Sequence, residues 1–279
     1  MYFRPSISWT EILKRTVAEI GADHCVGLAA QLAFYFFLAL FPALLFLVAL
    51  IGYLPVENAI SGLLEALGTV APGEALELLR VQLDELSRGR HGSLLTLGIV
   101  GAIWSSSAAM VAIIDALNHA YDVSEWRPWL RRRILAIVLT LSLALFIIAS
   151  LTLVLLGPSI VGWTADRLGV APAVEFAWRV ARWPVIFALV VFGVDLVYYF
   201  APNRTARWAW ITPGSLLATF LWVVSSFGFK FYVSNFGNYN VTYGAIGGVI
   251  VILLWFYVSA FAILIGAEMN GVIEQAERH

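Results

Sequence analysis

The sequence predicts an all-α membrane protein: a bundle of six transmembrane helices, with an amphipathic helix before it and a helical hairpin between the first two spans. Hydrophobic residues make up 61% of the 279 residues and charged residues only 13%, whereas about a quarter of a soluble domain is charged. Six apolar runs each reach the roughly 20 residues that cross the hydrocarbon core. Of all the Asp, Glu, Lys and Arg residues, only Asp195 and Lys230 lie inside these runs. The runs lack the alternation typical of β-barrel strands.

The predicted spans are the longest uncharged stretches of the chain. They cover residues 27–54, 93–114, 134–163, 184–201, 209–233 and 243–267. The third is long enough to tilt, to kink at Gly157-Pro158 or to end there. No linker is long enough to separate two domains, so we expect a single membrane domain over residues 1–279.

An amphipathic helix is predicted for residues 8–24. Ser8 and Glu11 have the spacing of a capping box. The apolar residues that follow recur at helical intervals; they are Trp9, Ile12, Leu13, Val17 and Ile20. We expect this helix to lie on the membrane surface. The alternative is a helix packed on the cytosolic side of the protein.

The segment between the first two spans predicts a helical hairpin over residues 56–88. Two helical patterns are separated by Ala71-Pro72-Gly73, a sequence that breaks a helix. We expect the hairpin to cover the outer ends of the spans. It is rich in Asp and Glu, which makes it a candidate docking surface for other envelope proteins.

The distribution of basic residues predicts the orientation. With six spans, more Lys and Arg fall on the side that holds both termini, and basic loops stay in the cytoplasm. The strongest element is the cluster before the third span, made of Arg127, Arg131, Arg132 and Arg133. The same cluster could instead hold anionic lipid head groups.

Asp195 is the first candidate functional residue, because an ionisable group inside a span is costly. It follows Pro184 by eleven residues, which predicts a depth of ~16 Å, near the middle of the membrane. Asp195 either contacts a proton, cation or head group in a polar cavity, or is an acid that is held neutral or hydrogen-bonded to a neighbouring helix. Gln31 and Pro42, in the first span, are further candidates to line a cavity or a pathway.

Enzymatic functions find little support in the sequence. The four histidines are scattered, and none forms a metal-ligand pair. The sequence contains neither a Walker loop nor a G-x-S-x-G elbow. We therefore expect no enzymatic activity, no metal and no cofactor. The net charge of −1 gives no basic surface for nucleic acid.

Short motifs along the chain resemble the YihY/BrkB family of bacterial inner-membrane proteins. They are Ala33-Phe34-Tyr35, Leu40-Phe41-Pro42, Trp104, Ala116-Leu117-Asn118, Tyr198-Tyr199-Phe200-Ala201-Pro202, Trp210, Pro213-Gly214, Tyr243-Gly244, Trp255-Phe256-Tyr257 and Gly266-Ala267-Glu268-Met269-Asn270. The resemblance extends over about residues 10–275. It implies a multi-pass protein of the bacterial inner membrane, and the distribution of basic residues predicts that both termini lie in the cytoplasm.

The family carries a virulence label and an old ribonuclease BN label, but it supplies no catalytic residue to carry over. The matching segments add Tyr199, Glu268 and Asn270 to the candidates for a cavity or pathway. Glu268 falls at the inner end of the last span, where a helix C-terminus disfavours an acid. We therefore expect it to pair with an arginine of residues 131–133 and to clamp two helices together.

Together these features predict a transporter-like protein that moves a lipid or small solute through a cavity near Asp195, bounded by the first, fourth and sixth spans. A non-transporting envelope scaffold is the alternative, and a membrane-embedded hydrolase or ribonuclease is the least favoured function. We expect membrane lipids as partners, and a homo-oligomer is left open.

Overall fold

A computed structural model describes residues 7–51, 80, 92–168, 171–205, 210–236 and 245–278. Apart from Arg80, the predicted hairpin 56–88 lies outside the described residues. Every regular element in the described ranges is an α-helix, which confirms the all-α prediction. The helices are α1 (Trp9–Ala22), α2 (Cys25–Ile51), α5 (Gly92–Ala120), α6 (Trp129–Leu168), α7 (Ala171–Phe200), α8 (Pro213–Phe236) and α10 (Ala245–Arg278).

Each of the six predicted spans coincides with one long helix. Among the described residues, four segments are long and apolar enough to cross a membrane: Trp129–Ser150, Phe176–Phe200, Pro213–Val233 and Gly247–Glu277. A fifth candidate arises if α1 and the first part of α2, which meet at a 66° bend, count as one broken span. α5 is not among the candidates found within the described residues, so the crossing of the membrane by α5 stays a prediction.

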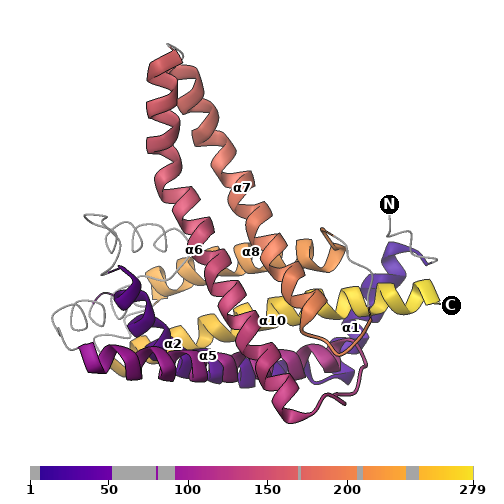
Figure 1. The fold of residues 1–279 in the computed structure, drawn as a ribbon. Helices are drawn as coiled ribbons and strands as arrows, with labels where there is room; N and C mark the ends of the chain where they lie inside the picture. The colour runs from indigo at the N-terminus through magenta and orange to yellow at the C-terminus, as the bar shows by residue number, and fades with distance from the viewer. Residues whose placement is uncertain are drawn as a thin grey trace.

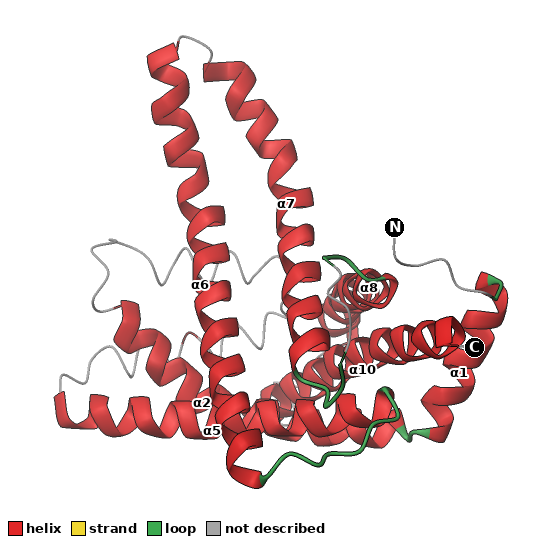
Figure 2. Cartoon of the chain, turned by 45° about the vertical axis from the view of Figure 1, so that its right-hand side comes forward, coloured by secondary structure: helices red, strands yellow, loops and turns green. Residues whose placement is uncertain are grey.

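The helices form two groups, as Figures 1 and 2 show. α10 packs against α8 and α2, and α2 packs against α5. α6 and α7 form an antiparallel pair that stands away from this group. The pair contacts the group through α5 and α8. The first described helix, α1, lies against the C-terminal part of the last one, α10 (Figure 1).

Several helix boundaries differ from the predicted spans, among them those of α7, α6 and α10. α7 begins at Ala171 and contains Pro184 within it, whereas the predicted span began at Pro184. A proline removes one backbone hydrogen bond, but a membrane helix tolerates that loss when neighbouring groups compensate. α6 continues through Gly157-Pro158 to Leu168. α10 extends past Ala267 to Arg278, because the residues beyond Ala267 still bury a face against α1 and α5.

The N-terminal helix confirms the predicted capping. The Ser8 side chain accepts a hydrogen bond from the Glu11 backbone N–H at 3.3 Å. One face of α1 packs on α10, where Ile12 is buried among Met269, Val272 and Ile273. The opposite face leaves Trp9, Leu13 and Val17 exposed. α1 therefore packs against the protein and also presents an apolar stripe outward.

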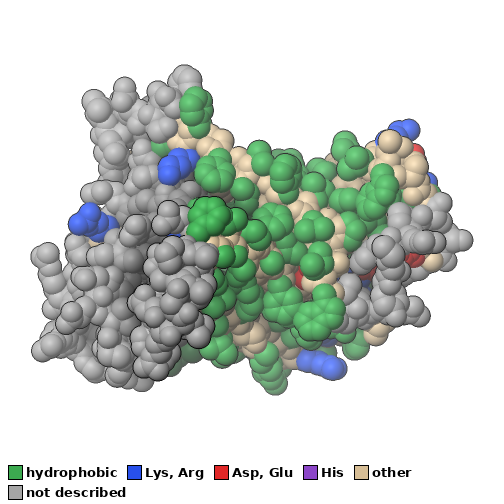
Figure 3. All heavy atoms as spheres, turned by 90° about the horizontal axis from the view of Figure 1, so that it is seen from above, with side chains coloured by type: hydrophobic (Ala, Val, Ile, Leu, Met, Phe, Trp, Pro, Cys, Tyr) green, Lys and Arg blue, Asp and Glu red, His purple; other side chains and the backbone are tan. Residues whose placement is uncertain are grey.

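The surface is largely hydrophobic. On the face drawn in Figure 3, hydrophobic side chains cover most of the described area and charged side chains are few. Exposed large hydrophobic residues occur on every described helix, among them Leu145 on α6, Phe176 on α7 and Phe231 on α8. A surface of this kind fits contact with lipid.

Candidate functional site: a polar end and an apolar cavity

One end of the structure gathers most of the buried polar groups; we call it the polar end. It comprises the loop 121–128, the C-terminal end of α7, the segment 201–205, the start of α8 and the C-terminal part of α10. The polar end is on the side to which the basic residues assign the cytoplasm. Its hydrogen bonds join α5, α7, α8 and α10.

The start of α8 explains Asp195. Thr212 precedes the helix and Pro213 is its first residue, the arrangement of an N-cap followed by proline. The Asp195 carboxylate, 2% exposed, accepts hydrogen bonds from Thr212 Oγ1 at 2.6 Å and from Ser215 Oγ at 2.8 Å. The Thr212 N–H also points to it, at 3.3 Å. An acid here benefits from the positive end of the α8 dipole.

Asp195 is therefore not at the middle of its helix. It lies five residues before the C-terminal end of α7, which corresponds to ~8 Å along the axis. The predicted depth was counted from Pro184, whereas α7 begins thirteen residues earlier, so the depth of Asp195 in the membrane stays a prediction. The sequence left open whether Asp195 faces a polar cavity or forms a hydrogen bond to a neighbouring helix. In the structure it forms hydrogen bonds to Thr212 and Ser215 at the start of α8.

Asn270 joins the same cluster from α10. Its Nδ2 donates to Thr212 Oγ1 at 2.9 Å, and its Oδ1 accepts from the Gly214 N–H at 2.9 Å. The first N–H groups of a helix have no partner within the helix. Asn270 thus satisfies one of these donors and ties α10 to α8. Asp195 and Asn270, far apart in the sequence, meet through Thr212.

Two glycines allow α8 and α10 to approach this closely. A Cβ atom on Gly214 would collide with the backbone oxygen of Gly266 and lie 2.6 Å from the Asn270 side chain. A Cβ atom on Gly266 would lie 2.6 Å from the Tyr198 hydroxyl. Tyr198 donates a hydrogen bond to the carbonyl oxygen of Ile263, which joins α7 to α10.

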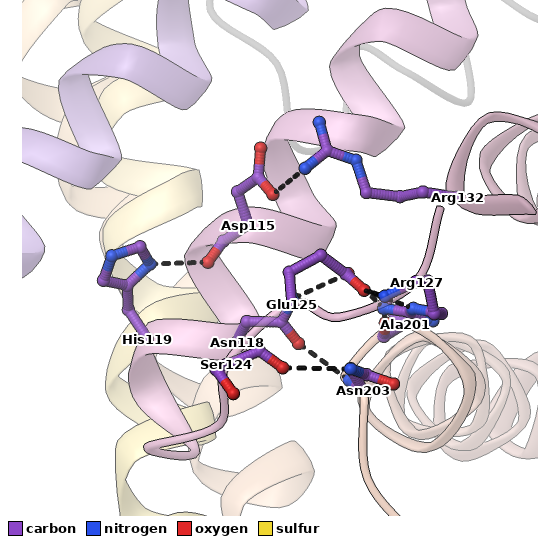
Figure 4. Close-up of polar contacts among 9 residues, drawn as sticks. All are labelled: Asp115, Asn118, His119, Ser124, Glu125, Arg127, Arg132, Ala201 and Asn203. Carbon is purple, nitrogen blue, oxygen red and sulfur yellow. Dashed lines mark hydrogen bonds and ion pairs between the residues drawn. The ribbon is translucent and has the colours of Figure 1, made fainter. Parts of the chain in front are cut away.

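The loop between α5 and α6 carries a second cluster, drawn in Figure 4. Glu125 and Arg127 pair through two hydrogen bonds of 2.8 and 2.6 Å, and Arg127 also donates to the Ala201 carbonyl at 2.9 Å. Asn118 donates to Glu125 at 3.0 Å and accepts from the Asn203 N–H at 2.7 Å. Burial opposes ionisation of Glu125, but the hydrogen bonds from Arg127 and Asn118 outweigh it, so the pKa of Glu125 is below its ordinary value.

The basic cluster divides into different roles. The Arg127 side chain is only 9% exposed and binds Glu125 and the Ala201 carbonyl, so it joins the loop to the end of α7, and its contact with lipid head groups stays a prediction. Arg132 pairs with Asp115 at 2.8 Å (Figure 4). Arg133 stacks on the Trp104 ring, with its guanidinium carbon 4.0 Å from the ring centroid. Arg131 is exposed, and its contact with lipid head groups stays a prediction.

Glu268 has a partner other than the predicted one. It is buried, 2% exposed, and accepts a hydrogen bond from the Cys25 thiol at 3.0 Å. The predicted arginine of residues 131–133 does not reach it. That prediction assumed that the helix ends at Glu268, whereas α10 continues for another ten residues. The contact still joins two helices, α2 and α10, as a clamp would.

Residues that the sequence did not single out complete the polar end. Arg204 forms an ion pair with Glu274 and stacks on the Tyr121 ring at 3.8 Å. The T-P-G-S sequence at residues 212–215 is a recognisable N-cap signal, since threonine before proline favours a helix start. The pairing of Arg204 with Glu274 has no such local signal, because the two residues are far apart in the sequence.

An apolar cavity of about 540 Å³ lies between the α6–α7 pair and the other helices. Its floor, toward the polar end, includes the buried residues Leu117, Tyr198 and Leu264. Its mouth includes Ile147 on α6 and Trp183 on α7, whose side chains are 48% and 49% exposed. The cavity is lined by residues of α2, α5, α6, α7, α8 and α10, whereas the prediction had a cavity near Asp195 between the first, fourth and sixth spans.

The predicted pathway residues lie elsewhere. None of Gln31, Asp195, Tyr199, Glu268 and Asn270 lines the cavity. Gln31 is exposed, and Tyr199 packs edge-on against Phe200 with ring centroids 4.8 Å apart. The backbone of α2 is helical through Pro42, whose side chain lies outside the described residues. Within the described part of the chain, no group of three or more His, Cys, Asp and Glu side chains could hold a metal ion.

Comparison with known proteins assigns the family. The model of the virulence factor BrkB family matches residues 16–279. The chain belongs to the BrkB family. A BrkB-family relative, the ribonuclease-like protein YfkH of Bacillus subtilis, is 37% identical over 250 residues, which are 90% of each chain. UPF0761 membrane proteins of Ralstonia nicotianae and Tolumonas auensis are 28% and 26% identical, over 91% and 64% of this chain.

The chain spans little more than half of these UPF0761 membrane proteins, 56% and 57% of their lengths. No solved structure matches the chain. The BrkB family and the membrane-protein names of its relatives agree with the apolar helices of the fold. Two of the segments that resemble the family meet in the structure. Gly214 lies close to Gly266, and Asn270 accepts a hydrogen bond from the Gly214 N–H.

Proposed function

We propose that this BrkB-family chain is a non-enzymatic protein of the bacterial inner membrane, with both termini in the cytoplasm, that moves a lipid or another apolar small molecule. The observation that carries the proposal is the cavity of about 540 Å³, which falls in the ~300–1,000 Å³ range of small-molecule sites. Membrane lipids are its proposed partners.

The lining of the cavity favours an apolar occupant. Its few polar side-chain atoms include three that are already bonded within the protein. Ser150 donates to Phe146 O at 2.8 Å, Trp222 donates to Ser259 at 3.2 Å, and Tyr198 donates to Ile263 O. These atoms offer little to a hydrated solute, which would lose its water without replacement.

The shape of the cavity favours a chain-like occupant. The lining residues on α7 run from Trp183 to Tyr198, a length of ~22 Å. One leaflet contributes about half of the ~30 Å hydrocarbon thickness. A lipid tail therefore fits along the wall. The hydrogen bonds of the polar end close the floor, so Asp195 serves as a latch between α7 and α8 rather than as a contact for the substrate.

A lipid-translocation assay tests the proposal. The purified chain is reconstituted into liposomes that carry a fluorescent phospholipid in both leaflets, and dithionite then bleaches the molecules that reach the outside. Val190 lines the cavity, so Val190→Trp should fill it and slow the translocation. Val224→Trp is the matched control, because Val224 is 50% exposed on α8.

Two results would refute the proposal. Bleaching that stops at the outer leaflet, as in protein-free liposomes, would show that the chain does not translocate phospholipid. Equal rates for the Val190→Trp and Val224→Trp proteins would show that any movement does not use the cavity. Translocation that only the Val190 variant slows is the expected result.

A further inference from the structure

The mouth of the cavity carries an unsatisfied basic group. Arg182 precedes Trp183, and its guanidinium carbon lies 5.3 Å from the centroid of the Trp183 ring. Trp183 belongs to the cavity lining. Arg182 therefore lies at the rim, at the end of the cavity away from the polar end. The positive charge of Arg182 therefore lies next to Trp183, the first residue of α7 that lines the cavity.

Trp178 adds a second donor on the same face of α7. The residues Trp178, Arg182, Ile186, Leu189 and Gly193 follow one another at three- and four-residue spacings, which places them in one row along the helix. The last three line the cavity. Arg182 and Trp178 continue that row by one turn and by two turns, or ~6 and ~12 Å beyond Ile186.

Both donors are buried and lack a hydrogen-bond partner. Among the described residues, Arg182 Nε and Trp178 Nε1 have no acceptor within reach. A buried N–H group without an acceptor costs free energy; in Arg182 this applies to Nε, while the side chain as a whole is half-buried. The contact with the Trp183 ring, at 5.3 Å from the guanidinium carbon to the ring centroid, uses none of the guanidinium N–H groups as a hydrogen-bond donor to an oxygen. The row thus presents two N–H donors and one positive charge above an apolar cavity.

We propose that the cavity binds an anionic amphiphile, with its tail along the α7 wall and its negatively charged head group on Arg182 and Trp178. This inference rests on the proposed function, because it takes the same cavity as the lipid site and names the class of lipid. Guanidinium groups bind both phosphate and carboxylate oxygens, so the shared chemistry is an anionic oxygen head on an apolar tail. In this proposal Arg182 gives the preference for a negatively charged head group, and the cavity gives the preference for an apolar tail.

Native mass spectrometry of the full chain in a non-ionic detergent tests the inference. The probes are dioleoylphosphatidylglycerol, dioleoylphosphatidylcholine, oleate and inorganic phosphate. The two phospholipids have the same tails, so their comparison isolates the head group. We expect phosphatidylglycerol to bind about tenfold more tightly than phosphatidylcholine, as one hydrogen bond to a charged group allows. Inorganic phosphate, which has no tail, should not bind.

Variants locate the site. Arg182→Gln should abolish the preference for phosphatidylglycerol, and Trp178→Phe, which removes only the N–H donor, should reduce it. Arg182→Lys keeps the charge and should retain part of the preference, so it serves if the glutamine variant does not fold. Lys14→Gln is the control that removes one exposed positive charge from α1, distant from α7 in the fold. It should leave the preference unchanged.

The outcomes separate this inference from the proposed function. Preferential binding of oleate as well as phosphatidylglycerol would assign recognition to any anionic head, and preference for phosphatidylglycerol alone would assign it to phosphate; both support the inference. Equal binding of the two phospholipids, or an unchanged preference in folded Arg182→Gln, would overturn it. If the chain translocates phospholipid but shows no head-group preference, the proposed function is supported and this inference is refuted. If it prefers phosphatidylglycerol but does not translocate phospholipid, the binding site is supported and the proposed function is refuted.

Discussion

The contact between Gly214 and Gly266 leads to a sharp prediction for stability. Replacing Gly214 with alanine places a methyl group against the Gly266 carbonyl oxygen and the Asn270 amide. The obstacle includes backbone, which cannot rotate away, so α8 and α10 must separate. Overpacking of a tight interface costs about 1–3 kcal/mol. Separation also breaks the 2.9 Å bond from the Gly214 N–H to Asn270, worth about 1 kcal/mol. We expect Gly214→Ala to lower the free energy of unfolding by about 3 kcal/mol.

Gly228 provides the matched control on the same helix. A Cβ atom at Gly228 would meet no atom within 4 Å. Gly228→Ala should therefore stabilise the protein by up to about 1 kcal/mol, the difference in helix propensity. The two variants differ only in position, yet the expected effects have opposite sign.

The assay is unfolding of the purified protein from mixed micelles with increasing dodecyl sulfate, followed by tryptophan fluorescence and by circular dichroism. The midpoint for Gly214→Ala should fall below that of the wild type, and the midpoint for Gly228→Ala should equal or exceed it. Equal midpoints for both variants would refute the reasoning, because they would mean that α8 and α10 do not meet at Gly214.

Three further predictions concern the polar end. Asp195→Ala should lower the free energy of unfolding by about 3 kcal/mol, since two hydroxyl hydrogen bonds to a carboxylate are lost; normal stability with lost translocation would instead place Asp195 in the pathway. The pKa of Glu125 is lowered from its ordinary value near 4.5, so its ionised form stabilises the fold above that pH. This contribution disappears as the pH falls through the folded-state pKa, and the stability gap between wild type and Glu125→Gln should narrow in chemical unfolding from pH 6 to pH 4; a constant gap would contradict it. Tyr198→Phe should cost about 1 kcal/mol, from one hydrogen bond, and calorimetry that finds no change would argue against that bond.

Local patterns in the sequence predicted the helices and the class of protein. In lipid, the backbone N–H and C=O groups of an uninterrupted apolar run find hydrogen-bond partners within an α-helix. Ser8 and Glu11 marked the start of α1. The helix ends were less predictable. Pro184 marked a boundary by sequence, yet α7 continues through it, because packing compensates for one missing hydrogen bond.

In the candidate site, too, the sequence identified individual residues but not their partners. Asp195 stood out by sequence because a charged group within an apolar run needs a partner, whereas Glu268 and Asn270 stood out because they lie in segments that resemble the BrkB family. Their partners came from other helices: Thr212 for Asp195 and Asn270, and Cys25 for Glu268. A periodic pattern reports which face of a helix is apolar, but not which helix lies opposite. The sequence therefore determined an all-α membrane protein and its buried polar residues. Only the tertiary structure decided that those residues join the helices at one end of the molecule. It also decided that the cavity, with Arg182 at its mouth, lies between the α6–α7 pair and the other helices. The physical reason is that cavities and buried hydrogen bonds form where helices distant in the sequence meet.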